Sequence, residues 1–273
     1  MTTAGDKKLE NLTEQNRIAW ETRSKLLGAS LKSVLCKGLP DVVNEHLHHW
    51  HKNLILNIIE NKHKLRILDV GCGYGRLSIP IIEKFPNVDI TGVDISENYV
   101  RLYKENTCHP AFVGGIENIP SDLGTFDYIL CVAVLMYLDD ENLGKAVFNL
   151  ISHLKPGGRL ILIEPNHSGI LFQTGFRMVT LLMEWIQPET VNTGGRFFKK
   201  NEIENLINNR GGKIILEKRI PVSSLCFLPM AFLGVVLPDK IARRICKLIT
   251  RFDDLTGGFK LPSISVAYVV TKI

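Results

Sequence analysis

The residues best placed to do chemistry lie where two apolar segments end. The first segment ends at Asp69 and runs into three alternate glycines, Gly71, Gly73 and Gly75. Glycine lets the backbone turn tightly and approach a ligand closely, because a side chain there would collide with it or force an unfavourable φ. The second segment ends at Asp94, whose carboxylate can accept both hydroxyls of a ribose. The sequence therefore predicts a nucleoside-binding crevice.

The elements that position these residues are strands followed by helices. Residues 65–70 and 88–93 predict two buried strands, and a helix that begins near Gly75 would point free N–H groups at the ligand. Residues 126–131 predict a further strand, and residues 154–162 predict a turn that enters another. This alternation of short apolar runs with helix-length segments is typical of an α/β domain.

The order of acid and glycines separates two nucleotide-binding families. In the dinucleotide fingerprint the turn cradles a pyrophosphate, which an acid such as Asp69 would repel. The pattern from Asp69 to Gly75 resembles instead motif I of the class I S-adenosylmethionine-dependent methyltransferases, and the resemblance covers residues 65–165. It implies a Rossmann-like seven-stranded sheet in the order 3-2-1-4-5-7-6, with only strand 7 antiparallel. An N-terminal helical cover and an insertion before the last strand would complete the fold.

The resemblance also implies how S-adenosylmethionine is held. The family places an acid at Asp69 and the loop backbone near the cationic methionine end, and an acid at Asp94 on the ribose. The acid that often holds adenine falls on Gly115, so we expect the Ile116 N–H and apolar contacts to replace it; the alternative is that Glu117 supplies the carboxylate. The predicted cofactor-binding residues are Asp69, Gly71, Cys72, Gly73, Gly75, Asp94, Ile95, Ile116, Glu117 and Cys131.

Fewer residues of the acceptor-binding site can be identified from the sequence, because methyl transfer is an in-line displacement that needs few catalytic side chains. Glu164 can pair with a cationic acceptor, and His167 can take a proton from an amine or hydroxyl. Trp20 and Tyr137 are placed to line the acceptor pocket. Structural alternatives stay open: both aromatic residues can be core anchors, and Glu164 can cap locally or pair with Arg17 or Arg196.

The length of 273 residues favours one methyltransferase domain over residues 1–273. We divide it into a helical cover (1–62), a cofactor-binding core (63–165) and an acceptor-side half (166–273). The last part contains an insertion, 221–262, with an apolar stretch followed by a basic amphipathic pattern. We expect a lid packed on the enzyme, with a membrane-surface anchor and a dimer contact as the alternatives.

Composition argues against several classes of function. The net charge is +5 and no dense Lys/Arg block occurs, so a nucleic-acid partner is not favoured. The six cysteines form no Cys-x-x-Cys pair, which disfavours structural zinc. A metal site at His46, His48, His49 and His51 is the alternative to a polar helix face with Trp50 turned inward, and we favour the polar face and no metal. The polar N-terminus has no signal pattern, so we expect a cytoplasmic protein.

Together these observations predict an S-adenosylmethionine-dependent methyltransferase that acts on a small molecule or a modified peptide natural product, at an amine nitrogen. In general character the chain is similar to the N-methyltransferases of the azole-rich plantazolicin type, which methylate an N-terminal arginine. One alternative is a lipid, sterol or quinone O- or C-methyltransferase at a membrane surface. The other is a non-catalytic protein that binds the cofactor. The oligomeric state stays open.

Overall fold

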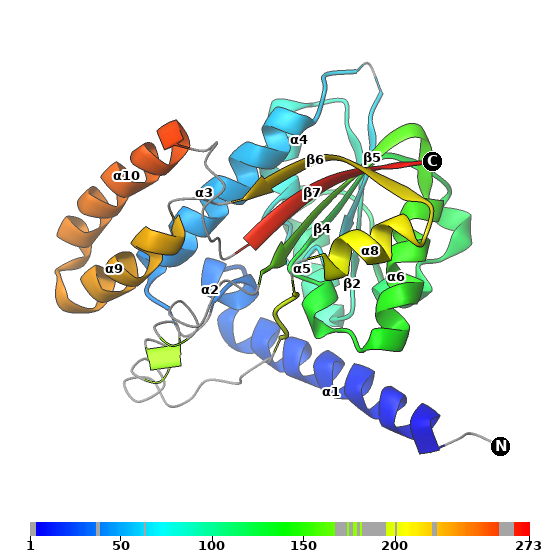
Figure 1. Ribbon diagram of the computed structural model, residues 1–273, viewed down its shortest axis with the longest axis horizontal. Coiled ribbons are helices and arrows are strands. Elements are labelled where there is room, and N and C mark those ends of the chain that lie inside the picture. Colours follow the sequence, from blue (N-terminus) through cyan, green and yellow to red (C-terminus); the bar gives the residue numbers. More distant parts are fainter. Residues whose placement is uncertain are drawn as a thin grey trace.

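A computed structural model describes most of the chain (Figure 1). The described residues are 4–36, 39–62, 64–166, 174, 177–178, 181, 195–199, 201–219, 223–256 and 265–273. The strands are β1 (Arg66–Val70), β2 (Asp89–Asp94), β3 (Ala111–Val113), β4 (Phe126–Val132), β5 (Leu154–Pro165), β6 (Gly212–Arg219) and β7 (Ser265–Lys272). The helices with described bounds are α1 (Ala4–Leu27), α2 (Leu31–Val34), α3 (Asp41–Ile58), α4 (Ser78–Lys84), α5 (Glu97–Thr107), α6 (Asp140–Ser152), α8 (Glu202–Asn208), α9 (Ser223–Val236) and α10 (Asp239–Thr256).

The seven strands form one sheet in the order β3-β2-β1-β4-β5-β7-β6. Strands β1 to β5 pair in parallel, whereas β7 pairs antiparallel with both β5 and β6. The predicted order and the single antiparallel strand are therefore confirmed. In this order β1 and β4 lie side by side although the intervening chain crosses to β3, so their carboxyl ends form the switch point where open α/β sheets bind ligands.

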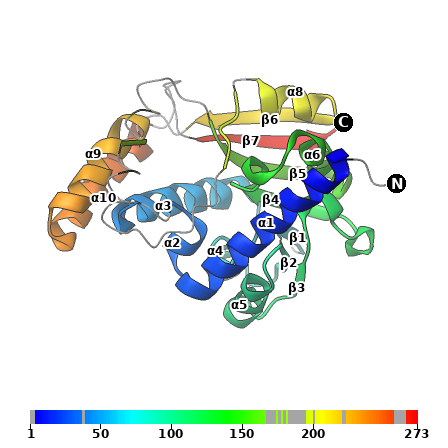
Figure 2. The ribbon, with the colours of Figure 1, turned by 90° about the horizontal axis from the view of Figure 1, so that it is seen from below.

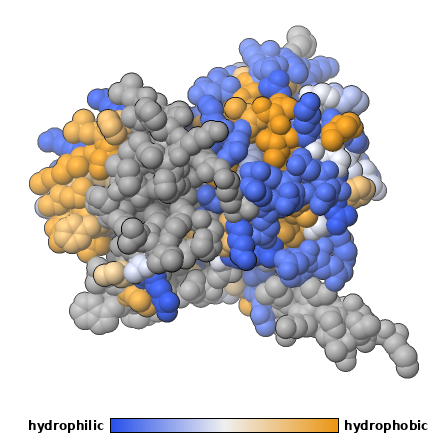
Figure 3. All heavy atoms as spheres, viewed as in Figure 1, coloured by the Kyte–Doolittle hydropathy of each residue, from blue (hydrophilic) through white to orange (hydrophobic). Residues whose placement is uncertain are grey.

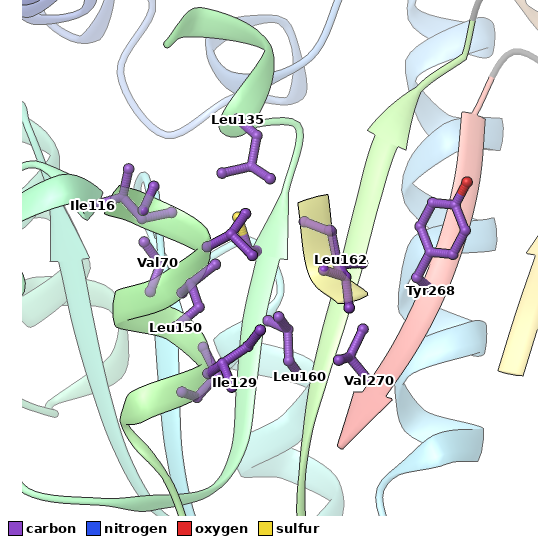
Figure 4. Packing of buried hydrophobic residues seen from close by; sticks show 14 of the residues in the cluster. Val70, Ile116, Ile129, Leu135, Leu150, Leu160, Leu162, Tyr268 and Val270 are labelled. Atoms are coloured by element: carbon purple, nitrogen blue, oxygen red, sulfur yellow. The ribbon is translucent and has the colours of Figure 1, made fainter. Parts of the chain in front are cut away.

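The sheet is buried on both faces, which explains why its strands read as continuous apolar runs. In β4, Tyr128 and Leu130 pack on the side of α3 and α4, while Ile129 and Cys131 pack on the side of α6 and α8. Figure 4 shows the second of these layers: Leu150 of α6 lies against Ile129. Alternate side chains along each strand therefore pack against the two helix layers. The carboxyl ends of the strands are left to form the pocket.

The N-terminal helices cover the carboxyl end of the sheet (Figure 2). Residues 8–36, whose apolar spacing predicts one helix within the helical cover, form two helices instead, because Gly28 adopts a left-handed φ of 54° that ends α1 before α2 begins. The Glu21 carboxylate of α1 accepts hydrogen bonds from the Ser96 hydroxyl (2.6 Å) and the Asn98 amide (3.1 Å), at the start of α5. These bonds hold α1 directly above the end of β2.

The insertion between β6 and β7 folds into α9 and α10, which pack beside α3 (Figure 1). Their shared contact with α3 buries Val43 and Leu47 of α3, Met230 and Ala231 of α9, and Ala242 and Cys246 of α10. No described residue of α9 or α10 lines the pocket at the end of β1 and β4, so the predicted lid over that pocket receives no support from these contacts. Among the described helices, none is both long and apolar enough to cross a bilayer.

Candidate cofactor and acceptor pocket

A pocket with an open space of ≈ 780 Å³ lies at the carboxyl ends of β1, β2 and β4. Its cofactor side is formed by the glycine-rich turn after β1 and by the residues that follow β2 and β3. Its other side is formed by α1, α2 and the turn after β4. The lining includes Gly71, Gly73, Asp94, Ile95, Gly115, Ile116 and Glu117 on the first side, and Thr13, Asn16, Trp20, Val34, Val134, Tyr137 and Leu138 on the second.

The turn after β1 needs glycine for both conformation and space. Gly71 and Gly73 have φ values of 67° and 54°, in the left-handed region that side chains rarely adopt. A Cβ on Gly71 would overlap the side chain of Val134, and one on Gly73 would lie 2.7 Å from Cγ1 of Val34. The turn therefore requires glycine at both positions, and the side chains that approach it closely, Val134 and Val34, also line the pocket.

Asp94 is held in a fixed orientation at the end of β2. Its Oδ2 accepts the Gly73 N–H at 2.8 Å, and its Oδ1 accepts the Ser96 N–H at 2.9 Å. The residue is only 8% exposed, and this burial raises the pKa of its carboxyl to about 6. Because the same carboxylate lines the pocket, its remaining lone pairs can accept hydroxyl donors from a ligand without any rearrangement of the turn.

Glu117 occupies the place where the sequence lacked an acid. A Cβ built on Gly115 would collide with the carboxylate of Glu117, so this side chain lies directly over the glycine. Both residues line the pocket together with Ile116. Asn149 of α6 donates a 2.6 Å hydrogen bond to the Glu117 backbone carbonyl, which fixes the short helical turn that carries it. This geometry supports the alternative in which Glu117 replaces the missing carboxylate.

Four predicted cofactor residues, Asp69, Cys72, Gly75 and Cys131, do not line the described pocket. Asp69 is buried and accepts a 2.6 Å hydrogen bond from the Ser78 hydroxyl at the start of α4, and burial raises its pKa to about 6. The Cys72 and Cys131 thiols lie in apolar clusters, and burial raises their pKa values. The side chains of Asp69, Cys72 and Cys131 therefore pack inside the protein and stabilise the turn and the sheet, without lining the pocket.

Trp20 and Tyr137 meet over the acceptor side of the pocket. Their ring centroids are 5.2 Å apart and the planes are nearly perpendicular, at 87°. Asn16, one turn before Trp20 on α1, donates a 2.9 Å hydrogen bond to the Tyr137 carbonyl. The guanidinium of Arg23 lies 4.9 Å from the Trp20 ring centroid. The two aromatic residues thus line the pocket and anchor α1, which is compatible with both the functional and the structural interpretation.

Glu164 lies behind the turn that follows β4 and does not line the pocket. Its Oε1 accepts the N–H groups of Val134 (3.0 Å) and Leu135 (2.8 Å), and its Oε2 accepts that of Met136 at 3.3 Å. The residue is 2% exposed, and this burial raises the pKa of its carboxyl to about 8. The contacts favour a structural role that shapes the pocket wall over the predicted pairing with a cationic acceptor. Arg17, one of the suggested partners, instead pairs with Glu14 at 2.6 Å.

The remaining predicted residues are placed as follows. His167 lies outside the described residues. His48 and His51 face the buried guanidinium of Arg76, with nitrogen distances of 3.2 and 3.4 Å. Burial lowers the pKa of His48 to about 4. His46 contacts Thr250 and His49 contacts Asn53, so the four rings do not converge on one point. Within the described chain, no group of His, Cys, Asp and Glu has a metal-binding arrangement.

Several pocket residues were missed by sequence reasoning. Thr13, Asn16 and Leu138 line the acceptor side. Their signals were weak, because small polar and aliphatic residues occur on every helix and loop. Asn16 lies one helical turn before Trp20 and on the same face of α1. This relation to Trp20 is the one signal that could have indicated it.

Comparison with known proteins agrees with this architecture. Residues 67–158 match the family described as a methyltransferase domain. The ubiquinone biosynthesis O-methyltransferase of Rickettsia felis is 28% identical over 151 residues, which are 54% of this chain. That alignment spans only 59% of the Rickettsia enzyme, so the similarity concerns a little over half of each protein.

Solved structures extend the likeness to most of the chain. The magnesium protoporphyrin IX methyltransferase of Synechocystis PCC 6803 with bound S-adenosylhomocysteine has a TM-score of 0.54 at 15% identity, over 85% of this chain and 86% of that one. An S-adenosylmethionine-dependent methyltransferase of Archaeoglobus fulgidus has a TM-score of 0.52 at 14% identity, over 82% and 94% of the two chains. Residues 67–158 are therefore a methyltransferase domain, and the chain has the Rossmann-like fold of the class I S-adenosylmethionine-dependent methyltransferases.

Proposed function

We propose that this protein methylates a small, uncharged and largely apolar acceptor, with S-adenosylmethionine as the methyl donor. The observation that carries the proposal is the distribution of charge in the pocket. Its charged lining residues within the described chain, Asp94 and Glu117, both belong to the cofactor side. The acceptor side consists of Trp20, Tyr137 and aliphatic residues, with Asn16 and Thr13 as the polar groups.

The cofactor side suits a nucleoside with a cationic tail. Asp94 is oriented by two backbone amides to accept ribose hydroxyls, and Glu117 can accept the exocyclic amine of adenine. Gly71, Gly73, Val34 and Val134 line the same pocket, and the remainder of the ligand would lie against them. When bound, S-adenosylmethionine supplies an electrophilic methyl group on a sulfonium centre.

The acceptor side contributes orientation and exclusion of water, which are the main requirements of an in-line displacement. Trp20 and Tyr137 form two walls at nearly a right angle, and a flat or branched apolar molecule would bury its faces against them. Against the described lining of this side, an ammonium or guanidinium group would lose its hydration without meeting a carboxylate, at a cost of several kcal/mol. An uncharged oxygen or carbon nucleophile fits this lining better than the amine predicted from Glu164.

The similarity to a ubiquinone biosynthesis O-methyltransferase points to the same acceptor class, although it covers little more than half of each chain. A modified-peptide acceptor depended on Glu164, and the described contacts of that residue lend it no support. The favoured acceptor is therefore a phenol- or quinol-like molecule with an apolar substituent.

A competition assay tests this proposal. The protein is incubated with S-adenosylmethionine and equimolar panels of apolar phenols, apolar amines and arginine peptides, and S-adenosylhomocysteine formation is followed together with the mass of each product. We expect methylated phenols to dominate. Exclusive methylation of amines or arginine peptides would contradict the acceptor class while leaving the methyl donor assignment intact.

The donor assignment has a separate test by calorimetry. Asp94→Asn removes the charge that would strengthen the bonds to the ribose, and a hydrogen bond to a charged group contributes about 1.5–3 kcal/mol. We expect the Kd of S-adenosylmethionine to rise by roughly tenfold to a hundredfold. Asp122→Asn, at an exposed carboxylate outside the pocket, is the matched control and should leave binding unchanged. Equal affinities of the two variants would refute the assignment.

A further inference from the structure

Helix α10 carries three stripes of different chemistry along its length. The apolar stripe is Ile241, Ile245, Leu248 and Phe252, at a spacing that places them on one face. The basic stripe lies beside it, because each of its members comes one residue before a member of the apolar stripe: Lys240, Arg244, Lys247 and Arg251. The packing stripe is Ala242, Cys246 and Thr250.

The stripe that faces the protein is the one with small side chains. Ala242 and Cys246 are 0% and 4% exposed against α3 and α9, and Thr250 lies 2.9 Å from Nδ1 of His46 on α3. The large apolar residues point elsewhere: Ile241 and Leu248 are 48% and 63% exposed. This is the reverse of an ordinary surface helix, whose large apolar residues are buried against its own core.

Helix α9 adds to the same exposed apolar surface. Phe232 and Val236 are 62% and 57% exposed, while their neighbours Met230 and Ala231 are fully buried. Figure 3 shows hydrophobic residues gathered at the end of the molecule where Figure 1 places α9 and α10. An exposed group of large apolar side chains of this kind marks an interaction surface.

The charges beside the apolar stripe identify the partner. All four residues of the basic stripe are exposed, and none of them pairs with a carboxylate within the described chain. Arg243 differs, because it pairs with Glu45 of α3 and with Asp239. A row of unpaired cations next to exposed Ile, Leu and Phe side chains matches the headgroup and acyl zones of an anionic bilayer.

We propose that the α9–α10 hairpin binds the surface of an anionic lipid membrane. The apolar stripe of α10, with Phe232 and Val236 of α9, enters the boundary between headgroups and acyl chains, and the basic stripe lies on the phosphates. The hairpin lies in the plane of the surface, since no described helix can span a bilayer. A second copy of the chain is a poorer partner, because its identical stripe offers no negative charge to the four cations.

Vesicle binding tests the proposal without reference to methyl transfer. The full-length protein is sedimented with vesicles of phosphatidylcholine alone and of phosphatidylcholine with phosphatidylglycerol. We expect binding to the anionic vesicles only, and release as the salt concentration rises, because charges further apart than the Debye length are screened. Binding to neither vesicle type would overturn the proposal.

Two double variants separate the apolar and basic contributions. Arg244→Gln with Lys247→Gln removes two surface cations, and each is expected to lower the partition coefficient about fivefold. Ile241→Ser with Leu248→Ser removes two exposed apolar side chains and is expected to lower it at least tenfold. All four positions are exposed or half-exposed, so both proteins should keep the parent's thermal midpoint.

The matched controls lie on α5 and α6, on the side of the molecule away from α9 and α10 (Figure 1). Phe148→Ser on α6 and Lys104→Gln on α5 change an exposed apolar residue and an exposed cation. They should leave partitioning unchanged. Equal loss in the control and α10 variants would overturn the proposal. So would a stable dimer by light scattering that the Leu248→Ser change dissociates, because the apolar stripe would then be a contact between copies.

Discussion

Glu164→Gln is the most informative single change, because it keeps the shape of the side chain and alters only its hydrogen-bonding capacity. The carboxylate accepts three backbone N–H groups from Val134, Leu135 and Met136. Because its pKa is raised to about 8, the carboxyl is protonated over most of the range below that pH, and both of its oxygens keep lone pairs that can accept an N–H. A Gln amide has one oxygen, which can keep the two shorter bonds, while its NH2 group faces the Met136 N–H donor. One buried donor is then left unsatisfied, at a cost of about 1–3 kcal/mol in the free energy of unfolding.

The pH dependence of this cost follows from the raised pKa of Glu164. The pKa of this carboxyl is raised to about 8 in the folded protein, whereas in the unfolded chain it is near 4.5, the ordinary value for glutamate. A raised folded-state pKa contributes stability that is complete below pH 4.5 and is lost as pH rises through about 8. The parent should therefore lose about 1.4 kcal/mol per pH unit relative to Glu164→Gln within this window.

The assay is urea unfolding of both proteins at several values between pH 5 and pH 8, with Glu83→Gln, an exposed glutamate on α4, as the control. We expect the stability advantage of the parent over Glu164→Gln to shrink and then reverse as pH rises, and Glu83→Gln to follow the parent throughout. An advantage that stays constant or grows with pH would refute the reasoning, since the buried carboxyl would then be ionised in the folded state.

Three further changes test the pocket itself. Gly71→Ala forces a side chain into φ 67° against Val134, a strain of about 1–3 kcal/mol, and should abolish S-adenosylmethionine binding in calorimetry. Glu117→Gln should weaken S-adenosylmethionine about tenfold, because it loses a charge-assisted hydrogen bond, whereas a cofactor analogue without the adenine amine should bind both proteins equally. Trp20→Ala should raise the acceptor KM at least tenfold with a much smaller change in cofactor Kd; the opposite split would contradict its place on the acceptor side.

The cofactor side of the site was predictable because its determinants are local in sequence. A left-handed turn requires glycine wherever it occurs, so Gly71 and Gly73 could be assigned from their spacing alone. Asp94 was predictable for a similar reason: it ends a strand next to β1, and parallel neighbours bring their carboxyl ends together. The sheet order followed from the resemblance that these residues carry.

Other features depend on contacts between distant segments and could not be assigned from residue types. Glu164 follows a strand end just as Asp94 does, yet the turn after β4 folds back and occupies its carboxylate. The position of the Glu117 carboxylate over Gly115 depends on how a short helical turn places a side chain two residues along. The sequence left open whether adenine meets the Ile116 N–H with apolar contacts or the Glu117 carboxylate, and the backbone path of this turn, which favours Glu117, could not be derived from residue types.

The orientation of α10 shows why an amphipathic pattern alone does not identify a buried face. The pattern suggested that the large apolar residues would pack on the enzyme, yet close approach to α3 uses the small residues Ala242 and Cys246. Small side chains let the backbones of two helices approach closely. Packing α10 through its small residues can therefore be as favourable as packing it through the larger apolar residues. With α10 docked in this way, Ile241 and Leu248 remain at the surface beside four cations. The exposed stripe is therefore a consequence of how the helix docks, and its location on α10, away from the pocket lining, separates membrane attachment from the binding of cofactor and acceptor.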